Sequence, residues 1–174
     1  PGDRAPRADL IALDGARIAV PDPAALVHLQ FRRFAGCPVC NLHLRQLAAR
    51  VDELRAAGVQ EVAVFHSEAA TMRPFQGDLP FDVVADPTRA LYRRFGVEAG
   101  WRSILDPRAW GAMLRGMFGR SSAFRGEGGH RGLPADFLIA PDGAIVAAKY
   151  GRHAADHWTT DELLALAAAH DAAR

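Results

Sequence analysis

The sequence is short of cysteine, and its two cysteines, Cys37 and Cys40, lie only three residues apart. A secreted scaffold held by disulfides needs more cysteines, spread along the chain. A bond between such close neighbours closes a very small loop and therefore adds little stability. Chemistry at the thiols explains the pair better than a structural disulfide does.

The chain also lacks an excess of charge and a long apolar run. Its 21 Lys and Arg nearly balance 20 Asp and Glu, so a net charge of +1 predicts neither nucleic acid nor an anionic membrane as a partner. No stretch approaches the roughly 18 apolar residues of a transmembrane helix, and residues 1–7 have no signal-peptide core. We expect a cytoplasmic protein. A length of 174 residues, 49% of them hydrophobic, predicts one domain over 1–174.

Apolar periodicity and turn signals predict an alternation of short strands and helices. The order is a hairpin, then β-α-β-α, then β-β-α, which predicts an α/β fold with a central mixed β-sheet flanked by helices. The predicted elements are a hairpin over 9–20, strands over 25–31, 59–66, 81–85, 136–140 and 144–150, and helices over 38–57, 68–75, 87–95 and 159–169.

The two cysteines stand where a predicted strand passes through a short loop into a helix. Pro38 suits the first helical turn, which places Cys37 at the N-cap. Unpaired backbone amides and the helix dipole favour a thiolate there, and Arg32 and Arg33 add positive potential. Cys40 lies one turn further on the apolar side, within reach of a disulfide. We therefore expect an exposed, attacking Cys37 and a buried, resolving Cys40.

Two other interpretations of the pair are open. One is that both cysteines are ordinary core residues, although their place at a strand–loop–helix junction favours redox chemistry. The other is a zinc site, because His153 and His157 also have ligand-like spacing. More than a hundred residues separate the two pairs, unlike the short spacer of a zinc finger. We expect no metal and no other cofactor.

Several segments together resemble a known family. They are Ala5-Pro6 leading to Asp14-Gly15, and residues 31–45, 79–92 and 132–143. Over nearly its whole length the chain resembles the peroxiredoxin-like branch of the alkyl hydroperoxide reductase/thiol-specific antioxidant (AhpC/TSA) family, within the thioredoxin-fold superfamily. The resemblance implies a thioredoxin-like core, redox chemistry at Cys37, and a cis-proline at Pro134 facing the dithiol.

The chain departs from that family's pattern near the dithiol. Typical members carry Pro-x-x-x-Thr/Ser-x-x-Cys, whereas Gln30 and Phe34 hold the corresponding positions here. The nearest candidate for the family's activating arginine is Arg131, which is offset from the expected place. The Cys-Pro-x-Cys sequence is also similar to glutaredoxins and disulfide oxidoreductases.

Three functions follow from these patterns. The first is an antioxidant thiol-dependent oxidoreductase that reduces peroxides, with Cys37 and Cys40 cycling between dithiol and disulfide. The second is a thiol–disulfide oxidoreductase acting on protein or small-molecule disulfides. Either enzyme needs a reducing thiol partner such as a thioredoxin or glutathione system. The third is a non-catalytic redox sensor or binding module.

Residues 101–131 form an insertion where a compact fold needs only a connection. Asp106-Pro107 is a helix start signal, and six arginines against two acidic residues give the segment a positive charge. An apolar stripe follows at helical spacing, formed by Trp110, Met113, Leu114, Met117 and Phe118. The pattern predicts a helix that packs on its own domain; a lid, a homodimer face or a docking helix are the alternatives.

Overall fold

The computed structural model describes residues 3–97 and 134–173, so the predicted insertion over 101–131 lies outside the described residues. Its elements alternate much as the sequence predicts. They are β1 (Ala8–Ile11), β2 (Arg17–Val20), β3 (Leu26–Phe31), α1 (Pro38–Ala48), α2 (Val51–Ala56), β4 (Val59–Phe65), α3 (Ala69–Gln76), β5 (Asp82–Ala85), α4 (Ala90–Arg94), β6 (Ala135–Ile139), β7 (Ile145–Tyr150) and α6 (Thr160–Ala172).

The central sheet is mixed, as predicted, with β3 in its middle. Its strand order is β5-β4-β3-β6-β7. Strand β3 is parallel to β4 and β4 to β5, whereas β6 is antiparallel to both of its neighbours. The predicted N-terminal hairpin is present as the separate β1–β2 pair, which turns at Gly15 with φ +94°. A central mixed α/β sheet with this hairpin confirms the predicted fold class.

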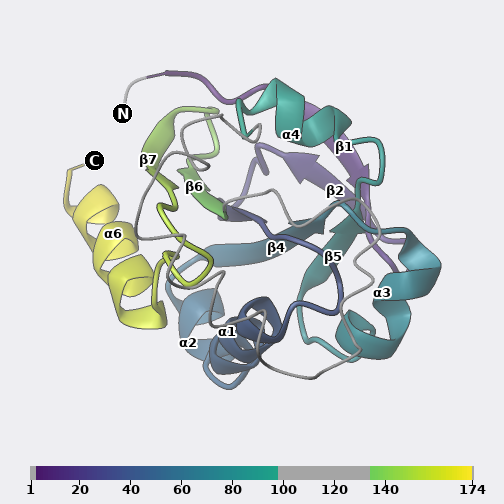
Figure 1. Cartoon of the computed structure of the whole chain (residues 1–174). Coiled ribbons are helices and arrows are strands. Elements are labelled where there is room, and N and C mark those ends of the chain that lie inside the picture. The colour runs from purple at the N-terminus through teal and green to yellow at the C-terminus, as the bar shows by residue number, and fades with distance from the viewer. Residues whose placement is uncertain (1–2, 98–133, 174) are drawn as a thin grey trace.

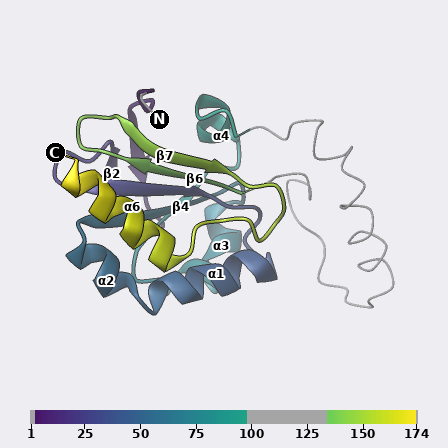
Figure 2. The same ribbon diagram turned by 90° about the vertical axis from the view of Figure 1, so that its left-hand side faces the viewer.

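Two layers cover the two faces of the sheet (Figures 1 and 2). Helices α1, α2, α3 and α6 pack on one face, where their apolar side chains share a core cluster with both cysteines. The hairpin and α4 pack on the other face around a second apolar cluster. Because β3 lies between the clusters and leads directly into the dithiol loop, the fold places the two cysteines above the middle of the sheet.

All four predicted helices differ somewhat from the structure in their bounds, and two of these differences have a local structural reason. The helix predicted over 38–57 is interrupted between α1 and α2. There the Arg50 amide donates a hydrogen bond of 3.0 Å to the Leu47 carbonyl, three residues back and not four as in a regular α-helix. The Arg50 side chain is held there by Glu53 and by Asp161 of α6. Helix α4 begins later than predicted because Arg89 adopts a left-handed conformation, with φ 57°. No helix among residues 3–97 and 134–173 is long and apolar enough to cross a membrane.

Candidate active site

The dithiol lies where the sequence predicts it. Cys37 is the N-cap of α1, Pro38 is the first helical residue, and Cys40 follows in the first turn. The Cys37 amide donates to the Phe34 carbonyl at 3.0 Å and so closes a β-turn just before the helix. This turn delivers the Cys37 side chain to the positive end of the helix.

The two thiols have opposite acidities. A hydrogen bond from the Cys40 thiol, the backbone amides of Cys40 and Val39, and the charge of Arg33 together lower the pKa of Cys37 to about 6, against the opposing effect of burial. The same thiol–thiol hydrogen bond, together with burial, raises the pKa of Cys40 far above its ordinary value. Near pH 7, Cys37 is therefore mainly a thiolate, and Cys40 keeps its proton.

The prediction that Cys37 is exposed was wrong. Its exposed fraction is 2%, and that of Cys40 is 0%. Phe34 and Ala35 from the preceding turn and Trp158 from the segment before α6 belong to the same apolar cluster. A substrate therefore reaches the Cys37 sulfur only when a neighbouring group moves.

A buried polar network on the α1 face of the sheet was not predicted. His28 lies between Glu61 of β4 and Asp136 of β6, with ring nitrogen to carboxylate distances of 2.7 and 3.2 Å. Arg32 donates to Asp136 and to Gln30, each at 2.7 Å, and Gln30 donates to Glu61. The available signal was the alternation of polar residues at positions 28, 30 and 32, which puts all three on one face of the strand.

Opposite charges keep this network ionised. Although burial opposes it, Glu61 and Asp136 raise the pKa of His28 to about 9. Burial likewise opposes ionisation of Asp136, but Arg32 and His28 hold its pKa well below the usual range. Near neutral pH, His28 is therefore protonated and Asp136 ionised, and both lie under the helix that bears the dithiol.

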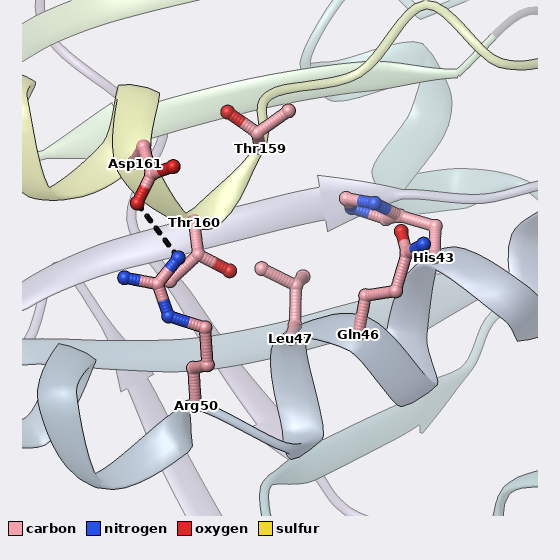
Figure 3. Close-up of a pocket in the computed structure, with 7 residues that line it drawn as sticks. All are labelled: His43, Gln46, Leu47, Arg50, Thr159, Thr160 and Asp161. Carbon is pink, nitrogen blue, oxygen red and sulfur yellow. Dashed lines mark hydrogen bonds and ion pairs between the residues drawn. The ribbon is translucent and has the colours of Figure 1, made fainter.

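A small pocket lies further along α1, lined in part by His43 (Figure 3), whose ring stacks on that of His157. The rings of His43 and His157 are 3.5 Å apart, and burial and the charge of Arg32 lower the pKa of His43 to about 2. The pocket, of about 190 Å³, separates α1 from the start of α6. Arg50 at its edge is already neutralised by Glu53 and Asp161. The lining residues are His43, Gln46, Leu47, Arg50, Thr159, Thr160 and Asp161.

Of the other predicted supporting residues, the structure describes Arg33 and Pro134 but not Arg131. Arg33 adds positive charge beside Cys37 and lies 5.6 Å from the centre of the Phe34 ring. Pro134 is buried just before β6, and since Phe31 pairs with Ala135, it lies at the end of the sheet from which the dithiol loop departs. Leu133 is outside the described residues, so the predicted cis bond stays a prediction. Arg131 is outside them too.

The zinc interpretation has no support from the described part of the chain. His157 stacks on His43. Within residues 3–97 and 134–173, no group of three or more His, Cys, Asp or Glu side chains is arranged to hold a metal ion.

A mixed sheet whose central strand leads into a dithiol at a helix start defines the thioredoxin-like class of proteins. Within that class, the chain belongs to the AhpC/TSA antioxidant enzyme family, whose model matches residues 46–153, more than half of the chain. The match begins after Cys40, so family membership does not depend on the dithiol. Membership supports a thiol-dependent oxidoreductase as the general class of activity.

Solved structures share the fold at low sequence identity. Peroxidoxin BcpB from Mycobacterium tuberculosis is 15% identical, with a TM-score of 0.70 over 97% of this chain and 96% of its own. A putative thiol:disulfide interchange protein DsbE from Chlorobium tepidum is 22% identical, with a TM-score of 0.64 over 95% and 96%. A mutant of peroxiredoxin Q from Xanthomonas campestris is 17% identical, with a TM-score of 0.64 over 96% and 92%. A comparison with curated proteins finds no match.

Proposed function

We propose that the protein is a thiol-dependent peroxide reductase in which Cys37 attacks and Cys40 resolves. The observation that carries this proposal is the position of Cys37 at the N-cap of α1, where the Cys40 thiol and the amides of the first turn lower its pKa to about 6. A thiolate that is present at neutral pH is the nucleophile this reaction needs. Family membership supports the same chemistry.

The reaction has two steps within the protein. The Cys37 thiolate attacks the terminal oxygen of a hydroperoxide, the O–O bond breaks, and the alkoxide that leaves takes a proton from water. Cys37 is then a sulfenic acid. Cys40 attacks its sulfur, and the Cys40 proton leaves with the sulfenic hydroxyl as water, so that a Cys37–Cys40 disulfide remains. An external dithiol, from a thioredoxin or glutathione system, restores the reduced pair.

Thiol–disulfide exchange is the second candidate. Phe34, which is 6% exposed, occupies the position of the family's peroxide-orienting hydroxyl. The Cys-Pro-x-Cys sequence and the structural likeness to a putative thiol:disulfide interchange protein favour a disulfide substrate. In that reaction the Cys37 thiolate attacks a substrate disulfide, and Cys40 then releases the substrate from the mixed disulfide.

The test compares substrates and single-cysteine variants. Reduced protein is mixed with hydrogen peroxide, an alkyl hydroperoxide or a small disulfide, and thiol loss is followed with time. We expect fast hydroperoxide consumption and an internal disulfide in the wild type, no consumption in Cys37→Ser, and a trapped sulfenic acid in Cys40→Ser. A hydroperoxide reaction no faster than that of free cysteine contradicts the proposal. Fast disulfide exchange would then favour the second candidate, and two slow reactions a redox sensor.

A further inference from the structure

The turn before Cys37 is held by side chains from three other places in the fold. Its two central residues are Ala35 and Gly36, between Phe34 and Cys37. The Ala35 amide donates to Ser67 Oγ at 3.0 Å, just beyond the end of β4. The side-chain amides of Asn41 on α1 and Gln76 on α3 both donate to the Ala35 carbonyl, each at 2.8 Å. Both polar groups of this one residue's backbone are thus bound by side chains.

These three residues, Asn41, Ser67 and Gln76, are called the turn clamp below. Ala35, Ser67 and Gln76 have exposed fractions of only 1%, 2% and 1%. Gln76 also donates to the Asn41 side-chain oxygen at 2.5 Å, so two members of the clamp are joined to each other. In this water-poor place, losing Ser67 leaves the Ala35 amide unsatisfied, and losing Asn41 or Gln76 leaves the Ala35 carbonyl with one donor instead of two. Either loss is more costly than losing an exposed hydrogen bond.

The acidity of Cys37 depends on the backbone position that this turn gives to Cys37. The contacts that lower its pKa are with the Cys40 thiol and the amides of Cys40 and Val39, and all of these lie at the start of α1. They require the backbone of Cys37 to keep its extended N-cap conformation, with φ −67° and ψ 111°. Rotation of the Ala35–Gly36 peptide would turn Cys37 away from those donors.

We infer that Asn41, Ser67 and Gln76 are positioning residues for Cys37: they fix the Ala35 backbone, and so keep the thiolate at the start of α1. The inference rests on the proposed role of Cys37 as the attacking thiol. The clamp joins α1, α3 and the end of β4 to a single turn, so each member acts on Cys37 without touching its sulfur. Neither Arg131 nor a threonine at position 34 is needed for this effect.

The test measures the acidity of Cys37 directly. The rate of Cys37 alkylation by iodoacetamide is followed against pH, with the modified peptide identified by mass spectrometry. We expect Gln76→Met and Ser67→Ala each to raise the midpoint from about pH 6 by about one unit, which lowers the thiolate fraction at pH 5 about tenfold. Asn41→Leu should shift it in the same direction, and this part-buried site is a second choice if the other variants fail to fold.

Two controls separate positioning from simple loss of stability. Ser67→Thr keeps the hydroxyl and should keep the wild-type midpoint. Gln60→Met makes the same chemical change as Gln76→Met at the opposite end of β4, where it removes a 2.9 Å bond to Asp82; it should lower Tm without moving the midpoint. The inference is overturned if the clamp variants lower Tm but titrate like the wild type. The readout is the thiol itself, so this result stands whichever substrate Cys37 proves to attack.

Discussion

Strand β3 presents two unlike faces, although both are equally buried. Toward the hairpin and α4 it places Val27, Leu29 and Phe31, each 0% exposed and surrounded by apolar side chains. Toward the helix that bears the dithiol, β3 places the polar side chains of His28 and Gln30, which are also 0% exposed. Hydrophobic burial explains the first face. It cannot explain the second, because buried charges lower stability unless each is paired.

The difference between the two faces shows that the fold keeps costly buried charges on the side of the sheet that carries the dithiol. On the polar face, one terminal nitrogen of Arg32 donates to both Asp136 and Gln30, whereas its Nε and Nη1 atoms are buried without a hydrogen-bond partner among the described residues. Burial, assisted by the positive charge of Arg32, keeps His43 neutral, and the same charge opposes the rise in the pKa of Cys40. The polar face therefore sets the charges around the dithiol, whereas the apolar face holds the sheet and the hairpin together.

The largest effect is expected from breaking the ion pair on the polar face. Asp136→Leu leaves Arg32 and His28 as buried cations without this partner, and should lower the free energy of unfolding by about 3–5 kcal/mol. Urea unfolding of the variant and the wild type measures the difference. In the double variant Arg32→Met/Asp136→Leu much of this stability should return. A double variant as unstable as the single one would show that lost packing, not the unpaired charge, causes the effect.

On the apolar face, Leu29→Ala should act through packing alone. Leu29 is 0% exposed, so the cavity should lower the free energy of unfolding by about 3 kcal/mol. The alkylation midpoint of Cys37 should stay where it is in the wild type, because no charge near the thiol changes. A shift of that midpoint would contradict the separation of the two faces.

A smaller effect is expected in the pH dependence of stability. His28, with its pKa raised to about 9, stabilises the fold below pH 6.5, and this contribution is lost as the pH rises toward 9. Cys37, with its pKa lowered to about 6, works in the opposite direction, because its ionisation favours the folded state as the pH rises from about 6 toward the value of an ordinary cysteine, about 8.5. In the wild type, the changes in the free energy of unfolding with pH that His28 and Cys37 cause therefore have opposite signs.

Removing Cys37 should reveal the contribution of His28. In Cys37→Ser the free energy of unfolding should fall by about 2–3 kcal/mol between pH 6.5 and 9, as measured by denaturant unfolding at each pH. Adding His28→Leu should flatten the slope. A stability that rises with pH in Cys37→Ser would mean that His28 is neutral in the fold.

Local patterns were sufficient to predict most of the fold. Apolar periodicity located the strands, and Pro38 after Cys37 located the helix start, because both signals lie within one element. The break between α1 and α2 was missed, since Arg50 is held by Asp161, 111 residues away in the sequence.

The parts of the site that the sequence did not predict also depend on contacts between residues far apart in the chain. Ser67 and Gln76 reach Ala35 across 32 and 41 residues, and Cys37 shares its buried apolar cluster with Trp158 from the far end of the chain. Such contacts exist only after the sheet has assembled. The polar network is an intermediate case: its alternation was visible within β3, but its partners Glu61 and Asp136 lie on other strands.

The decisive property of the wild-type protein is the acidity of Cys37 relative to that of Cys40. Alkylation of reduced protein at a series of pH values, with Cys37 and Cys40 peptides quantified separately, gives one midpoint for each thiol. We expect a Cys37 midpoint near pH 6 and a Cys40 that stays unreactive until the pH is far more alkaline. A Cys37 midpoint near that of an ordinary cysteine, about 8.5, or a Cys40 that reacts first, would contradict this expectation.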